Sequence, residues 1–280
     1  MMTSIHQRGI ERIWTVDHRQ NSPIHIAGMV LDPNKMKESD PFLFLAEDWF
    51  QKGTFDFHPH RGIETVTYVI EGKLEHQDSK AGKGELGPGD VQWMTAGRGV
   101  IHIEDPAEGE TVHSLQLWVN LPREHKMAEP RYQNLRAQDM PVRQEDGSSI
   151  RIFSGSSGGI QSATKNYVPV TMVEINVEPG ASVTQDLPGD YNGFMYILEG
   201  KGLFGKNQTE AGKGHVLLLE KANPEDESEI TIKAVENLRV LLYAGKPLNE
   251  PIVARGPFVM NTEEEIRQAY RDYMAGKFTE

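Results

Sequence analysis

The sequence "YVIEGK" at residues 68–73 recurs as "YILEGK" at residues 196–201, at an offset of 128 positions. A second pair follows in the same order, "AGKGEL" at 81–86 and "AGKGHV" at 211–216, at an offset of 130. In each copy an apolar stretch ends in Glu-Gly-Lys, and a Gly-rich turn introduces another apolar stretch. Two matches in one order at nearly one offset predict a tandem duplication.

Short apolar runs fill most of the remaining chain, for example "DVQWMTAG", "SLQLWVNLP", "VTMVEINVEPG" and "LRVLLYAG". Gly, Pro, Asp and Asn separate them, and many short strands with frequent turns are typical of a β-sandwich or β-barrel. A parallel α/β protein would need helical patterns between these runs, and they are not there. We therefore expect an all-β protein of two tandem antiparallel barrels.

The most Gly- and Ser-rich segment is "RQEDGSSIRIFSGSSGGIQSATKN" at 143–166. It predicts a linker region between an N-terminal domain at 1–142 and a C-terminal domain at 167–280. Within it, "SGSSGG" lacks the Gly-Lys-Ser/Thr ending of a phosphate-binding loop, and no helical pattern follows. A mobile loop is therefore the favoured interpretation.

The C-terminus departs from the strand pattern. "NTEEEIRQAYRDYMAGK" at 261–277 has an Asn or Thr cap, three glutamates in its first turn and apolar residues at helical spacing. It predicts a short amphipathic helix that packs on a barrel surface and ends the C-terminal domain.

Composition limits the classes of function. The 280 residues carry a net charge of −12 and contain no cysteine, so a metal site must be built from nitrogen and oxygen ligands. Negative charge without a basic cluster argues against direct nucleic-acid binding. There is no apolar run of membrane-spanning length and no signal-peptide pattern, so we expect no membrane association and a cytoplasmic location.

Two short motifs hold the candidate chemistry. His58 and His60 lie two residues apart at the start of a predicted strand, and His102 and Glu104 repeat that spacing in "GRGVIHIEDP". Residues two apart on a strand share a face, so the two pairs meet if their strands are neighbours. Three imidazoles and a carboxylate suit Fe(II), Mn, Co, Ni, Cu or Zn.

These motifs resemble those of the pirins, a branch of the cupin superfamily. The resemblance rests on "HPHRGIETVTYVIEGKLEHQDS", "GPGDVQWMTAGRGVIHIE", "SLQLWVNLP" and "GPFVMNTEEEIRQAYRDYMAG". It implies a bicupin with one divalent metal ion, usually iron as Fe(II), in the N-terminal barrel. Carried over by motif, the implied metal ligands are His58, His60, His102 and Glu104.

A second carboxylate needs a separate assignment. Many cupins take their carboxylate ligand from a position four residues after the second histidine, and Glu64 occupies that position here. We expect Glu64 to point to the metal face. The pirin pattern prefers the carboxylate of His-x-Glu, so Glu104 is the expected ligand and Glu64 a supporting hydrogen-bonding group.

The second copy lacks such a motif. Subtracting the repeat offset places Asp186 and Pro188 at the positions of the first two histidines, and Asn192 at the position of the carboxylate. His215 is the one histidine in that half of the sequence, and it follows "AGKG" rather than a metal motif. We expect no metal there and a packing role for the second barrel.

The resemblance implies dioxygenase activity on flavonols such as quercetin, with dioxygen as co-substrate. The flavonol 3-hydroxyl would lose its proton to Glu104, and the central ring would open with loss of carbon monoxide. A flat aromatic substrate needs an apolar slot. Candidates to line it, for which ordinary core is the alternative, are Phe55, Phe57, Trp93, Met94 and Trp118; candidates to hold substrate hydroxyls are Arg61 and Gln116.

Two other functions stay open. The resemblance to pirins also implies a metal-dependent, redox-sensing regulator that binds a transcription factor or a metabolic enzyme. An acidic surface suits a protein partner. A cupin isomerase or a metal-free sugar binder would require the histidine motifs to be coincidental. Metal analysis and quercetin turnover discriminate among the three.

Overall fold

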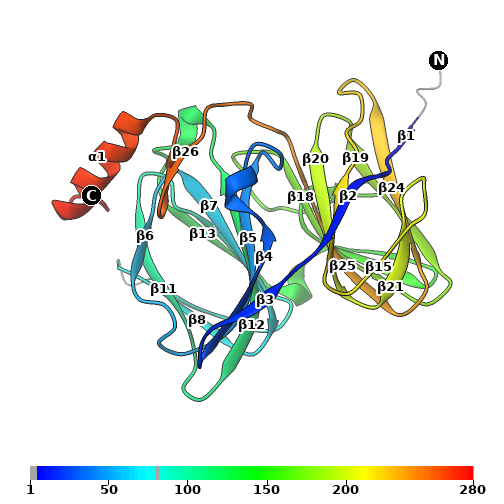
Figure 1. Ribbon diagram of the computed structural model, residues 1–280, viewed down its shortest axis with the longest axis horizontal. Helices are drawn as coiled ribbons and strands as arrows, with labels where there is room; N and C mark the ends of the chain where they lie inside the picture. The colour runs from blue at the N-terminus through cyan, green and yellow to red at the C-terminus, as the bar shows by residue number, and fades with distance from the viewer. Residues whose placement is uncertain (1–4, 80–81, 280) are drawn as a thin grey trace. The chain divides into compact units, whose positions relative to one another are not determined.

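The computed structural model describes residues 5–79 and 82–279, which form two compact units of β-structure (Figure 1). The N-terminal barrel contains Asp17–Gln138 and Leu248–Glu280, and the C-terminal barrel contains Met1–Val16 and Asp139–Pro247. The predicted all-β class, with two antiparallel barrels and a short C-terminal helix, is confirmed. Within the described ranges no helix has the length and apolar composition to cross a membrane.

Two antiparallel sheets build the N-terminal barrel. The larger has the order β13-β10-β7-β12-β5-β4-β3, and the smaller has the order β6-β11-β8-β9. Figure 1 shows β6 and β11 across the barrel from β5. Phe50, Val69 and Val112 of the larger sheet share a buried cluster with Leu74 and Leu86 of the smaller one, so apolar packing joins the two sheets. The elements are β3 (His18–Ser22), β4 (His25–Leu31), β5 (Phe42–Gln51), β6 (His58–His60), β7 (Ile63–Glu71), β8 (Leu74–Asp78), β9 (Lys83–Leu86), β10 (Val91–Thr95), β11 (Val100–Pro106), β12 (Thr111–Asn120), β13 (Arg131–Leu135), and the 3-10 turns η1 (Pro33–Lys35), η2 (Arg123–His125) and η3 (Ala137–Asp139), the last of which ends at the boundary between the units.

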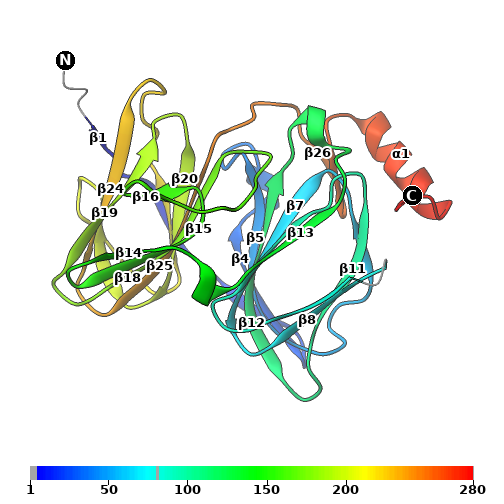
Figure 2. The same cartoon turned by 180° about the vertical axis from the view of Figure 1, so that it is seen from behind.

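The C-terminal barrel repeats this plan. Its larger sheet has the order β14-β15-β18-β25-β20-β23-β2, and its smaller sheet has the order β1-β24-β21-β22 with β19 also paired to β24. Figure 2 shows β15, β18 and β25 of the larger sheet together with β19 and β24. Its strands are β1 (His6–Gln7), β2 (Ile10–Thr15), β14 (Val142–Glu145), β15 (Ser148–Ser154), β16 (Ser156–Ser157), β17 (Ile160–Gln161), β18 (Val170–Val177), β19 (Ser182–Pro188), β20 (Asn192–Glu199), β21 (Lys201–Phe204), β22 (Thr209–Gly212), β23 (His215–Leu219), β24 (Glu227–Ala234) and β25 (Leu238–Gly245).

The domain boundaries differ from the predicted ones. The first strands of the chain, β1 and β2, pair with β24 and β23 of the C-terminal barrel. The predicted linker at 143–166 instead contains β15, β16, β17 and most of β14. Composition indicated a linker because glycine and serine favour turns, but here the turns connect short paired strands.

The C-terminal segment also belongs to a different unit from the predicted one. It forms β26 (Val253–Arg255), β27 (Phe258–Met260) and α1 (Glu263–Met274), and all three belong to the N-terminal barrel. The predicted cap is Thr262, whose side chain and that of Glu265 form a capping box. Buried Ile266 of α1 shares an apolar cluster with Phe258 of β27, so the helix is anchored through the strand that precedes it.

Candidate metal centre

Three histidine rings converge on the wall of the N-terminal barrel where β6 and β11 pair. His58 and His60 point to one face of β6, and the antiparallel register sets His102 of β11 opposite His58. The ring centroids of His58 and His102 lie 4.5 Å apart, and those of His60 and His102 lie 5.1 Å apart. One nitrogen from each ring lies within 4.8 Å of the others, so a single ion can reach all three.

The carboxylate of Glu104 is held by two polar side chains. The Thr67 hydroxyl lies 2.7 Å from Glu104 Oε1 and 2.5 Å from Gln116 Oε1, and its single proton serves one of them at a time. The Gln116 amide donates to Glu104 Oε2 at 3.0 Å. Such partners fix the direction in which a carboxylate presents its remaining lone pairs. Gln116, a candidate substrate contact from sequence, therefore also orients Glu104.

His76 of β8 joins this group and was not predicted. The register sets it opposite Glu104, and single ligand atoms of His76, His102 and Glu104 lie within 4.8 Å of one another. Sequence reasoning missed it because "LEHQDS" matches neither the His-x-His nor the His-x-Glu motif, although Asp78 follows His76 at strand spacing. The available signal was alternation, since Leu74 and His76 are both buried on one face of β8 while Glu75 between them is exposed.

Burial favours the neutral form of His60, His76 and His102. Burial and the neighbouring His58 lower the pKa of His60 to about 3, and burial with the surrounding histidines holds the pKa of His102 well below its usual value. Burial likewise lowers the pKa of His76. A neutral imidazole is the form that binds a metal. Neither ring nitrogen of His76 or His102 has a hydrogen-bond partner among the described residues, which is unusual for buried polar atoms. A bound cation would provide a partner for one nitrogen of each ring.

The cluster opens on a cavity of about 550 Å³ inside the N-terminal barrel. His58, His60 and Glu104 are among its lining residues, together with Phe55 and Trp118, two of the aromatic residues named from sequence. Cavities of this size with mostly apolar walls and a few polar groups are typical of small-molecule sites.

The other sequence-named lining candidates lie elsewhere. Phe57 is 47% exposed and is absent from the cavity wall. Trp93 is fully buried, and Met94 packs with Ala96 and Val100, which is the ordinary core alternative. Arg61 donates to Asp272 of α1 at 2.7 Å, so it anchors the C-terminal helix instead of lining the cavity.

The prediction that Glu64 points to the metal face is wrong. Glu64 and Thr67 are three residues apart on β7, so their side chains leave opposite faces of the strand, and Thr67 is the one that contacts Glu104. The hydroxyl of Thr95 donates to Glu64 Oε1 at 2.7 Å. Burial raises the pKa of Glu64 to about 6. The predicted hydrogen-bonding role therefore holds, but away from the histidines.

The corresponding wall of the C-terminal barrel carries buried Gln185, Leu187, Ser228 and Ile230 in place of the histidines. Gln185 pairs with Ile230 and Leu187 with Ser228, as His58 pairs with His102 and His60 with Val100. The repeat offset had placed Asp186 and Pro188 there, but both are exposed on the outer face of β19, while Leu187 and Ile230 belong to the barrel's buried core. No group of three metal-ligating side chains is present among the described residues of this barrel.

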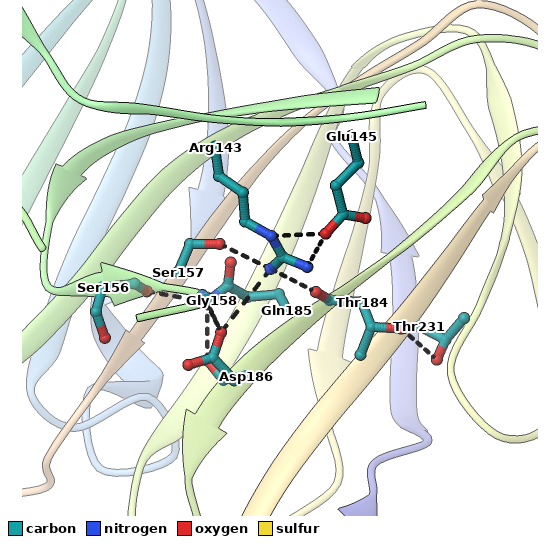
Figure 3. Close-up of polar contacts among 9 residues, drawn as sticks. All are labelled: Arg143, Glu145, Ser156, Ser157, Gly158, Thr184, Gln185, Asp186 and Thr231. Carbon is teal, nitrogen blue, oxygen red and sulfur yellow. Dashed lines mark hydrogen bonds and ion pairs between the residues drawn. The ribbon is translucent and has the colours of Figure 1, made fainter. Parts of the chain in front are cut away.

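A hairpin also lies against β19 of the C-terminal barrel. The segment predicted to be a mobile loop, residues 154–159, contains β16, which pairs with β17 directly after it. Figure 3 shows Arg143 reaching Ser157 of this hairpin and the Thr184 carbonyl of β19, at 3.2 and 3.0 Å. The backbone N–H of Gly158 donates to Asp186 Oδ1 at 2.7 Å. Asp186 therefore holds a hairpin, which accounts for a charged residue near the place where the repeat predicted a ligand.

Comparison with known proteins was made on both sequence and structure. The family model described as "Pirin" matches residues 10–119, and "Pirin C-terminal cupin domain" matches residues 172–279. A pirin-like protein of Solanum lycopersicum is 44% identical over 244 residues, which cover 87% of this chain and 83% of the relative.

Two solved structures are similar over nearly the whole chain. The crystal structure of GK1651 from Geobacillus kaustophilus has 64% identity and a TM-score of 0.87, covering 89% of this chain and 100% of that one. A structure called quercetin 2,3-dioxygenase, from Acinetobacter baumannii, has 30% identity and a TM-score of 0.86, covering 97% and 98%. With two family models matched along the chain and a relative of 44% identity, this protein belongs to the pirin family of cupins.

Proposed function

We propose that the protein is a mononuclear metal-dependent dioxygenase that cleaves flavonols such as quercetin. The observation that carries the proposal is a pair of metal-capable groups that share His102, one with His58 and His60 and the other with His76 and Glu104. His58, His60 and Glu104 line a largely apolar cavity. A similar structure that bears the name quercetin 2,3-dioxygenase supports the same reaction class.

The metal ligands in this proposal are His58, His60, His102 and Glu104. Fe(II) is the first expectation, and Mn, Co, Ni, Cu and Zn also suit the donor set. A bound redox-active ion would supply the Lewis acidity and the electron-transfer capacity that reaction with dioxygen requires.

The chain's own groups supply binding and proton transfer. Glu104 accepts the proton of the flavonol 3-hydroxyl, and its hydrogen bonds from Thr67 and Gln116 hold the carboxylate toward the substrate. Phe55 and Trp118 give the flat ring system an apolar wall. The apolar side chains of the wall also limit the number of water molecules beside the reacting carbons.

The test is turnover by protein loaded separately with Fe(II), Mn, Co, Ni or Cu. We expect quercetin absorbance to fall in air, with release of one carbon monoxide per quercetin consumed, for at least one metal. His60→Ala should abolish turnover and reduce the bound metal, whereas the matched control His215→Ala, in the other barrel, should leave both unchanged. Metal bound at one equivalent with no turnover for any of the five ions would overturn the dioxygenase proposal and favour the regulatory alternative.

A further inference from the structure

A second polar pair faces the same cavity, outside the histidine cluster. His25 begins β4 and Asp48 lies in β5, and both line the cavity wall. His25 Nε2 lies 2.7 Å from Asp48 Oδ1, and the two side chains are 14% and 11% exposed. Neither residue is near the proposed metal ligands in sequence.

Asp48 interrupts an apolar row. Phe44, Ala46 and Phe50, which alternate with it along β5, line the same cavity. Burial raises the pKa of Asp48, and the hydrogen bond with His25 opposes that rise. Since an apolar side chain at this position would avoid the cost of burying a carboxylate, the pair points to a polar ligand.

His25 is held in one orientation. Its ring packs edge-on against Phe55, with centroids 5.4 Å apart and an interplanar angle of 73°. Phe55 in turn packs against Phe50 with centroids 5.0 Å apart. With Asp48 bonded at Nε2, Nδ1 is the ring nitrogen left to bond a ligand, and it carries a lone pair in the tautomer that has its hydrogen on Nε2. The pair therefore offers a fixed acceptor for a hydroxyl group.

Strand register relates this pair to the metal cluster. Ser114 of β12 lies opposite Asp48, and Gln116, two residues along β12, points to the same face and holds Glu104. Diagonal neighbours on adjacent strands have Cα atoms about 7–8 Å apart. A flat substrate bound by its hydroxyl at the cluster can therefore extend along the wall toward His25.

We propose that His25, oriented by Asp48, accepts a hydrogen bond from a phenolic hydroxyl on the pendant ring of the substrate, remote from the ring that is cleaved. The inference rests on the proposed function and deepens it. His25 is then a specificity-determining residue that selects flavonols with a hydroxylated pendant ring, and Asp48 is a positioning residue.

The experiment compares quercetin with galangin, a flavonol that has no hydroxyl on its pendant ring. Two quantities are measured: kcat/KM with the metal-loaded protein, and Kd with metal-free protein from quenching of tryptophan fluorescence. Wild type should prefer quercetin about tenfold in both, the effect of one hydrogen bond. The double variant His25→Phe/Asp48→Leu removes the pair without leaving a buried charge, and its preference should fall to about one while galangin values stay within twofold.

His18→Phe is the matched control. His18 also pairs with a carboxylate, Glu47 Oε2 at 2.5 Å, but Glu47 leaves β5 on the face opposite Asp48. This variant should keep the tenfold preference. If the double variant does not fold, His25→Phe alone retains ring packing against Phe55 and is scored by the same ratio.

The outcomes separate the two proposals. An unchanged preference in a folded variant overturns the role of His25, as does absence of quercetin binding to both metal-free and metal-loaded wild type. Loss of turnover with every metal overturns the dioxygenase, while the Kd ratio of the metal-free protein still decides the role of His25.

Discussion

Replacing Thr67 by valine should weaken metal binding about tenfold or more. The substitution keeps the shape of the side chain but removes the hydroxyl that lies 2.7 Å from Glu104 Oε1. A hydrogen bond to a charged group contributes about 1.5–3 kcal/mol, and about 1.4 kcal/mol corresponds to a tenfold change in Kd. Loss of a group that orients a metal ligand typically weakens binding by about 10- to 100-fold, in the same range.

The assay is a competition titration of Co(II) or Zn(II) against a chromophoric chelator, with wild type and Thr67→Val side by side. Thr67→Ser keeps the hydroxyl and should bind like wild type, which separates the hydrogen bond from the packing. Gln116→Leu removes the second donor to Glu104, at 3.0 Å, and should weaken binding to a similar extent. Wild-type affinity in both Thr67→Val and Gln116→Leu would refute the assignment of Glu104 as a ligand held by this pair.

Three further outcomes are expected. His76→Ala should lower metal affinity about tenfold or more in the same titration, because its ring lies beside His102 and Glu104. Burial lowers the pKa of Lys126 to about 7, so above that pH the unfolded chain binds more protons than the folded one. The free energy of unfolding in urea should therefore rise by about 2 kcal/mol from pH 7 to 9 in the wild type. Lys126→Met should show no such rise. Asp272→Ala leaves the buried Arg61 without its carboxylate and should cost about 1–3 kcal/mol in the same unfolding assay, with faster amide exchange in α1.

The duplication was visible in the sequence because β7 and β20, the two copies of one strand, each contain a buried tyrosine and are each followed by the same Glu-Gly-Lys turn. The sequence did not show that β1 and β2 belong to the C-terminal barrel, or that β26, β27 and α1 belong to the N-terminal barrel. Pairing of β2 with β23, 200 or more residues away, leaves no local pattern, since an edge strand has the same sequence pattern in either barrel. The fold class therefore followed from local pattern, whereas the membership of each terminal strand depended on long-range contacts.

The same limit explains the site. His58, His60 and His102 were found because ligands two apart on a strand share a face whatever the tertiary structure. Glu64 was misplaced because the prediction extended the two-residue alternation of β6 past the end of that strand. β6 ends at His60, and a turn at Gly62, with φ of 79°, precedes β7. A side chain at Gly62 would meet the Val259 carbonyl at 2.0 Å, so the turn is fixed and the alternation restarts after it.

The difference between the two barrels then has a structural account. In the N-terminal barrel, β6 and β11 set His58 opposite His102. In the C-terminal barrel, the corresponding strands β19 and β24 set Gln185 opposite Ile230. In the first, the ring nitrogens of buried His102 have no hydrogen-bond partner among the described residues, and the neighbouring His58 and His60 line a cavity. In the second, Ile230 and Leu187 fill the interior and Asp186 faces outward to a hairpin. Because a filled core excludes both ion and substrate, restoring histidines at Gln185 and Leu187 alone should not create a metal site, and metal analysis of that double variant should still find one equivalent per chain.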